Sequence, residues 1–136
     1  MCVGLHLWRH ETRQLKLIDW SLSETVAPSG GQAAGPLSHS VYCTRNYRAP
    51  ELYMGAPSEV DVTPGADLWS AGCVVFEAKT KGRLVEGETS SEVRINLKRL
   101  VKNGCVGLHS RCQLAGIFHK FIRKCMEHDP KQRAFV

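Results

Sequence analysis

Apolar side chains recur three and four positions apart through the second half of the chain, a spacing that predicts helices. One helix is expected over residues 66–79, with Thr63 as its cap and Pro64 at its first position. Its apolar residues occupy nearly every face, so this helix is expected to be central and buried. They are Leu68, Trp69, Ala71, Cys73, Val74, Val75 and Phe76.

Two further helices are expected towards the C-terminus. Ser90 and Ser91 are placed to cap the first, whose apolar stripe is Val93, Leu97, Leu100 and Val101. The second is expected over residues 114–127, because the Asp129-Pro130 pair disfavours helix beyond it. Its apolar set is Leu114, Ile117, Phe118, Phe121, Ile122, Cys125 and Met126.

The first half of the chain shows less regular patterning. Residues 14–19 predict a short strand, with Leu15 and Leu17 on one face. Residues 28–40 are rich in Pro, Gly, Ser and Ala and predict a loop. The expected fold is therefore mainly α, with one short β-strand or hairpin followed by a helical subdomain.

Length and composition limit the possible classes. The chain has 136 residues, of which 43% are hydrophobic, which suits a single domain with one modest core. No apolar stretch approaches the roughly 20 residues that cross a bilayer. Residues 1–8 lack a basic leader and a cleavage site, so we expect no signal peptide and a cytoplasmic or nuclear location.

Positive charge is concentrated in the last third of the chain. Residues 94–136 contain ten basic and two acidic residues, a net charge of +8, whereas residues 1–93 carry −3. Such a region is either a solvated surface or a docking surface for an acidic partner or nucleic acid. Aromatic residues are not interleaved with the charges, which disfavours nucleic acid and favours a protein partner.

The cysteines suggest one minor alternative. None of the six forms the closely spaced pair typical of zinc knuckles, so reduced thiols are expected. Cys105, His109 and Cys112 are the only clustered metal-type ligands, and a structural zinc site would need a fourth.

Four segments, in order, resemble the signature of eukaryotic serine/threonine protein kinases. They are Leu15 to Ser21 (the Asp-Phe-Gly region), Tyr47 to Leu52 (Ala-Pro-Glu), Asp67 to Cys73 (the central helix) and His128 to Arg133 (the closing Asp-Pro…Arg motif). Residues 43–52 and 85–89 are similar to the branch of cyclin-dependent, mitogen-activated and glycogen synthase kinases. Trp20 and Ser21 depart from the usual Phe and Gly.

The resemblance divides the chain as a partial protein kinase domain over residues 1–136. Residues 1–20 would hold the strand or hairpin and the Asp-Phe-Gly-like motif, residues 21–51 the activation segment, and residues 52–136 the helical C-lobe. The N-lobe is expected to be absent.

The resemblance also implies roles for individual residues. Asp19 would hold Mg²⁺, because a carboxylate is a hard ligand that this ion prefers. Glu51 and Arg133 would form a buried ion pair, and Asp67 would bond the backbone of the catalytic loop. Thr44, Arg45 and Arg48 would belong to the substrate and activation segment, in which Thr44 would contact the catalytic loop and Arg48 would organise the segment. The candidate phosphorylation sites are Ser38, Ser40 and Tyr42.

Several parts of a complete kinase cannot be placed in these 136 residues. They are the glycine-rich loop, the phosphate-binding lysine and the loop carrying the catalytic Asp. No catalytic residue is therefore assigned, ATP and Mg²⁺ are expected only with an N-terminal half, and the isolated chain is expected to be inactive. The apolar face around Leu68, Val74, Val75 and Phe76 is expected to be partly bare. The alternative function is a pseudokinase-like adaptor that binds a protein through its basic C-terminal surface.

Overall fold

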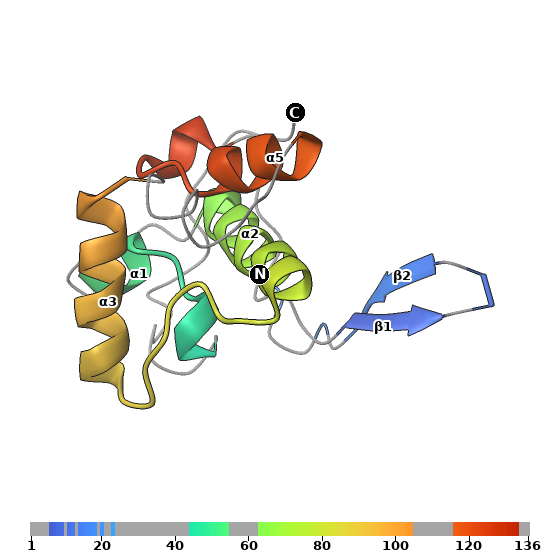
Figure 1. Ribbon diagram of the computed structural model, residues 1–136, viewed down its shortest axis with the longest axis horizontal. Coiled ribbons are helices and arrows are strands. Elements are labelled where there is room, and N and C mark those ends of the chain that lie inside the picture. The colour runs from blue at the N-terminus through green and yellow to red at the C-terminus, as the bar shows by residue number, and fades with distance from the viewer. Residues whose placement is uncertain are drawn as a thin grey trace.

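The computed structural model describes residues 6–9, 11–12, 14–18, 20, 23, 44–54, 63–104 and 116–133. Figure 1 shows a two-stranded hairpin beside a group of helices, in which α5 lies across one end of α2 and α3 stands at the left. The elements in chain order are β1 (His6–Arg9), β2 (Gln14–Leu17), the 3-10 helix η1 (Arg45–Tyr47), α1 (Glu51–Met54), α2 (Pro64–Thr80), α3 (Ser90–Lys102), α5 (Ile117–Cys125) and the 3-10 helix η2 (Pro130–Gln132).

Strands β1 and β2 form an antiparallel hairpin, so the hairpin form of the expected fold is confirmed. His6 pairs with Leu17 and Arg9 with Gln14. The hairpin projects away from the helices (Figure 1), and Leu17 and Trp20 are 44% and 55% exposed. Leu17 and Trp20 therefore contribute little to the core.

Helix α2 is the centre of the core, as its apolar composition predicts. Trp69, Cys73 and Phe76 are each at most 2% exposed. Thr63 occupies the N-cap position and Pro64 follows it, but the Thr63 side chain makes no capping hydrogen bond. The expected cap is thus correct in position and wrong in mechanism.

The expected bare face of α2 is wrong for two of its four residues. Leu68 and Phe76 are buried, at 9% and 1% exposure, while Val74 and Val75 are half-buried. The polypeptide itself covers this part of the helix.

Helix α5 crosses α2 at close range where Gly72 removes a side chain. A Cβ at Gly72 would lie 2.7 Å from the Cβ of Cys125, closer than real Cβ atoms approach. Ile122, Cys125 and Met126 of this region are buried against α2. A helix-to-helix contact this close requires glycine at position 72.

The exposed end of α5 differs from the sequence prediction. The expected apolar set included Ile117 and Phe118, but these residues are 77% and 42% exposed. The Lys79 ammonium lies 3.8 Å from the centroid of the Phe118 ring. The expected start at residue 114 lies outside the described residues, and the described helix begins at Ile117.

Helix α3 has the expected apolar stripe and a different cap. Val93 and Leu97 are each 1% exposed, and Leu100 and Val101 pack against the core. Thr89, rather than Ser90 or Ser91, is the N-cap. Its Oγ1 accepts a hydrogen bond from the Glu92 amide at 3.2 Å, and Glu92 Oε2 accepts one from the Thr89 amide at 3.2 Å. This reciprocal pair is a capping box.

No helix in the described ranges is long and apolar enough to cross a membrane.

Candidate functional site

The Arg133 guanidinium lies at the junction of several chain segments that are distant in sequence. Its Nη1 and Nη2 donate to Glu51 Oε1 and Oε2 at 2.7 and 2.9 Å, which is a bidentate ion pair. Nη1 also donates to the Gly65 carbonyl at 3.0 Å. Nε and Nη2 donate to the Glu127 and His128 carbonyls at 2.7 and 3.2 Å. All five guanidinium donors therefore have acceptors.

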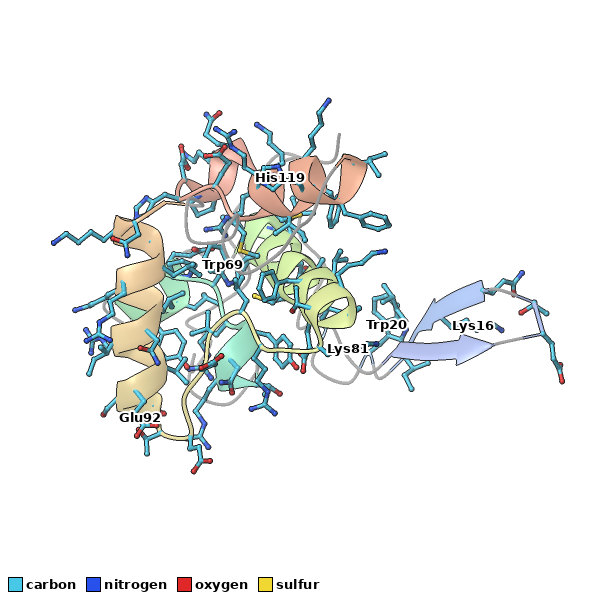
Figure 2. All side chains as sticks on the ribbon, viewed as in Figure 1. Lys16, Trp20, Trp69, Lys81, Glu92 and His119 are labelled. Carbon is cyan, nitrogen blue, oxygen red and sulfur yellow. The ribbon has the colours of Figure 1, made fainter. Side chains whose placement is uncertain are left out.

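Burial makes this arrangement structurally important. The Arg133 side chain is fully buried, and that of Glu51 is 18% exposed. The guanidinium carbon lies 5.1 Å from the centroid of the Trp69 ring, which sits in the middle of the helical part (Figure 2). A buried guanidinium needs both a counter-charge and a full set of acceptors, and this site supplies both.

Gly65 lets the first turn of α2 approach the η2 segment. A Cβ at Gly65 would lie 2.5 Å from the Pro130 carbonyl oxygen, a backbone atom that cannot easily move. On the η2 side, Asp129 Oδ1 accepts a hydrogen bond from the Lys131 amide at 2.9 Å and caps η2. The start of α2 and the turn before Arg133 are thereby held together.

The η1 segment, just before Glu51, is fixed by Asn46. This buried side chain donates from Nδ2 to the carbonyls of Val85 and Gly87, both at 3.0 Å. Arg45 Nη1 donates to the Glu88 carbonyl at 3.1 Å. Residues 45 and 46 thus attach η1 to the loop between α2 and α3.

Tyr47 attaches the same segment to α2. Its hydroxyl donates to Glu77 Oε2 at 2.5 Å, and its carbonyl accepts a hydrogen bond from Ser70 Oγ at 2.9 Å. Burial, and secondly the hydrogen bond to the Glu77 carboxylate, raise the pKa of Tyr47 above its usual value. The phenol therefore stays protonated and keeps donating through the neutral pH range.

Thr44 and Arg48 lie at the two ends of η1. Thr44 is exposed, and its carbonyl accepts the Tyr47 amide at 3.0 Å. Arg48 is half-buried, with its guanidinium 5.0 Å from the centroid of the Tyr53 ring. The Tyr53 hydroxyl donates to the Arg45 carbonyl at 3.0 Å.

Asp67 lies in the first turn of α2 and is half-buried. Burial disfavours the charged carboxylate and raises its pKa to about 6. A carboxyl group with this pKa is partly protonated near neutral pH.

Several sequence-predicted residues lie outside the described residues. They are the metal candidate Asp19, the phosphorylation candidates Ser38, Ser40 and Tyr42, and the zinc candidates Cys105, His109 and Cys112. Within the described ranges, no group of three His, Cys, Asp or Glu side chains could hold a metal ion. The described residues by themselves therefore offer no cluster of ligands for Mg²⁺.

The structure brings some predicted residues together and adds others. Glu51 and Arg133 meet directly. Arg45 is the first residue of η1 and Arg48 directly follows η1, whereas Asp67 lies on α2, two positions after Gly65. Sequence reasoning missed Asn46, Tyr47 and Ser70 as attachment points. The one sequence signal for Asn46 is that it is a polar residue within the segment that resembles the kinase motif. Its acceptors are backbone carbonyls 39 and 41 positions away, and the sequence does not indicate them.

Known proteins share this sequence pattern. The family model described as protein kinase domain matches residues 7–135. Cyclin-dependent kinase 20 of Rattus norvegicus is 39% identical over 79 residues, which is 58% of this chain and 21% of that protein. The human protein of the same name is 38% identical over the same shares. Protein kinase gsk31 of Schizosaccharomyces pombe is 34% identical over 92 residues, 68% of this chain and 22% of that protein.

The chain spans about a fifth of the length of these relatives. They belong to the branch that the sequence segments already resembled, and the family match extends across nearly the whole chain. The Glu51–Arg133 ion pair accordingly lies in a helical subdomain, which contains α2, and the segment that contains η1 precedes this subdomain in the sequence. The chain belongs to the protein kinase family, among the eukaryotic serine/threonine kinases related to cyclin-dependent and glycogen synthase kinases.

Proposed function

We propose that this chain is the activation-segment and C-lobe part of an ATP:protein serine/threonine phosphotransferase, and that these 136 residues alone do not transfer phosphate. The observation that carries the proposal is the fully bonded Arg133. It joins Glu51, at the end of the motif segment, to the start of α2 and to the residues before η2. This arrangement positions a substrate-contacting segment on a helical base without itself supplying a catalytic group.

The contacts of η1 support the first half of the proposal. Asn46 and Tyr47 attach the segment to the α2–α3 loop and to α2 at two separate points. Thr44 and Arg45, which are assigned to the substrate and activation segment, are exposed at the surface beside them. Protein substrates containing serine or threonine are the expected acceptors by family membership.

The second half of the proposal follows from the sequence. Phosphate transfer requires a residue that orients the substrate hydroxyl and groups that neutralise the phosphate charge. Among the motifs of residues 1–136, only Asp19 is a candidate for such a role, and it would act as a Mg²⁺ ligand. Activity would require ATP, Mg²⁺ and the remaining parts of a kinase domain in the native product.

Two measurements test these statements. The intact mass of the endogenous protein, captured with an antibody against residues 114–136, is expected to exceed 15.1 kDa. That product is expected to phosphorylate a serine- and threonine-containing protein, and Asp19→Asn is expected to abolish the activity. Glu11→Gln, at an exposed position of the hairpin, is the matched control and should leave the activity unchanged. Phosphate transfer by the purified 136-residue chain, lost on Asp19→Ala, would contradict the proposed inactivity.

A second function is favoured by the charge distribution. An endogenous product of 15.1 kDa would indicate a pseudokinase-like adaptor that binds a protein partner through the basic surface of residues 94–136. The exposed residues Lys98, Arg99 and Lys102 of α3 and Lys120 and Arg123 of α5 contribute to that surface. We propose a cytoplasmic or nuclear location for either form, and imaging of the tagged endogenous protein tests it.

A further inference from the structure

The outward side of α3 combines an exposed isoleucine with three cations. Ile95 is 51% exposed, whereas Val93 and Leu97, its neighbours two positions away, are each 1% exposed. Lys98, Arg99 and Lys102 are all exposed. We call Ser91, Ile95, Lys98, Arg99 and Lys102 the outer face of α3.

Helical geometry places these residues on one line. Ser91, Ile95, Lys98 and Lys102 follow one another at intervals of four, three and four positions. At about 100° per residue they stay within one narrow sector of the helix, opposite Val93 and Leu97. The line extends about 16 Å along the axis. The same spacing forms the seam along which two packed helices meet.

The positive charge of this face is not neutralised within the described part of the chain. Glu92 is the only carboxylate in α3, and its Oε2 accepts hydrogen bonds from the amides of Glu88 and Thr89 at 2.9 and 3.2 Å. These amides lower the pKa of Glu92, which therefore stays charged in the capping box (Figure 2 labels it at the start of α3). No described carboxylate forms an ion pair with Lys98, Arg99 or Lys102.

Helix stability accounts for only part of this pattern. Arg99 and Lys102 lie in the last turn, where cations interact favourably with the helix dipole. That interaction does not account for Lys98 or for Ile95. A β-branched residue is a mediocre helix former, and exposed in the middle of a cationic face it adds nothing to the fold.

We propose that the outer face of α3 binds an acidic amphipathic helix of a partner protein. An apolar side chain of the partner would cover Ile95, and carboxylates beside it would pair with Lys98, Arg99 and Lys102. The inference rests on the second proposed function, a basic docking surface, and assigns that surface to α3 and to one class of partner.

Charge complementarity selects this occupant over others. A second copy of the chain would place the same three cations against each other, which like-charge repulsion opposes. A nucleic acid would satisfy the cations and leave Ile95 without an apolar contact, and no aromatic residue of α3 offers a stacking surface. An acidic helix satisfies both kinds of side chain at once.

Binding of a defined peptide tests the proposal. The probe is a fluorescein-labelled helical peptide of about three heptads, with leucine at the seam positions and glutamate beside them. Its binding to the full 136-residue chain is followed by fluorescence anisotropy. Ile95→Ser is expected to weaken binding about tenfold, since it removes roughly half of a buried isoleucine contact. Lys98→Glu/Arg99→Glu/Lys102→Glu is expected to weaken it about 30-fold or more. Each substitution removes an ion pair with a glutamate of the peptide and replaces it with repulsion between two carboxylates.

The salt dependence of binding separates the contribution of the ion pairs from that of the apolar contact of Ile95. Raising the salt from about 50 to about 300 mM should weaken binding to the wild type and to Ile95→Ser, and hardly affect what binding the triple variant retains. The matched control is Lys16→Glu/Lys81→Glu/Arg83→Glu, which makes the same change in net charge at exposed positions outside residues 94–136. It should bind within about twofold of the wild type after correction for net charge. Circular dichroism checks that each variant is folded.

Four outcomes would overturn the inference. If the α3 triple variant binds like the wild type while Lys120→Glu/Arg123→Glu loses binding, the adaptor function remains and its assignment to α3 is wrong. If the peptide does not bind at all, both are wrong. Tighter binding of a labelled RNA or DNA duplex, lost in the α3 triple variant, would identify a nucleic-acid surface. A concentration-dependent dimer that Ile95→Ser abolishes, seen by sedimentation, would identify a second copy as the occupant.

Discussion

Replacing Arg133 by methionine gives the sharpest test of how this structure is held together. The substitution keeps an unbranched side chain of moderate volume and removes five hydrogen bonds. It leaves the Glu51 carboxylate, which is only 18% exposed, without its counter-charge. Breaking a buried ion pair from one side costs about 3–5 kcal/mol. That is a large share of the roughly 5–15 kcal/mol that stabilises a domain.

The double variant Glu51→Met/Arg133→Met separates the charge contribution from the rest. It removes the stranded carboxylate, so it should be more stable than Arg133→Met although it carries one more substitution. It should still be less stable than the wild type, because the carbonyls of Gly65, Glu127 and His128 lose their donor. The free energy of unfolding is measured by urea titration for the wild type, both single variants and the double variant, and the coupling energy follows from the cycle.

Two results would refute this reasoning. If Glu51→Met costs less than about 0.5 kcal/mol, the ion pair contributes no more than an exposed one. If the double variant is destabilised by the sum of the single effects, the two side chains do not interact energetically, whatever their distance. Lys131→Met is the matched control, since Lys131 is an exposed cation in the same turn and should be nearly neutral.

Three further predictions concern single positions. Burial raises the pKa of Asp67 to about 6 in the folded chain from an ordinary value of 3.8, so this group favours folding fully below about pH 3.8 and that contribution is lost as pH rises through about 6. The stability of Asp67→Asn relative to the wild type should therefore increase between about pH 4 and about pH 7.5 in urea titrations, and a constant difference would contradict the raised pKa. Lys81 ends α2 with φ of 60°, a conformation that glycine adopts without strain. Lys81→Gly should therefore increase the free energy of unfolding by about 0.5–1 kcal/mol, measured as a higher midpoint of thermal unfolding, whereas Lys81→Ala should not. Thr89→Ala should cost about 1 kcal/mol through loss of the capping box, and Ser91→Ala almost nothing; equal effects would place the cap wrongly.

The sequence predicted most of what depends on local pattern. Thr63-Pro64 and the dense apolar residues after it predicted a central α2, which the burial of Trp69 confirms. The cap of α3 was missed by one residue because Thr89, Ser90 and Ser91 are all competent caps. Only the glutamate three positions after Thr89 distinguishes them, since it completes the reciprocal bonds of a capping box.

Orientation about a helix axis was harder to predict than the helix itself. Ile117 and Phe118 fit the apolar spacing of α5, yet they are exposed, while Ile122 and Cys125 face α2. Periodicity identifies a stripe but not its full extent, because the width of the contact depends on the partner helix. Here the glycine at position 72 lets α2 approach the Cys125 end of α5 closely, whereas Ile117 at the opposite end is 77% exposed.

Contacts between distant segments lie beyond what a local pattern can indicate. Glu51 and Arg133 are 82 positions apart, and their pairing was expected only from the resemblance to protein kinases. Asn46 shows the same limit without that help. Its buried amide donates to the carbonyls of Val85 and Gly87, which satisfy it in the absence of water. Every residue has a backbone carbonyl, so the amino acids at positions 85 and 87 do not indicate that their carbonyls accept these hydrogen bonds. The attachment of η1 therefore depends on the folded conformation of the loop between α2 and α3. The residues of η1 can be recognised as attachment points only from the structure.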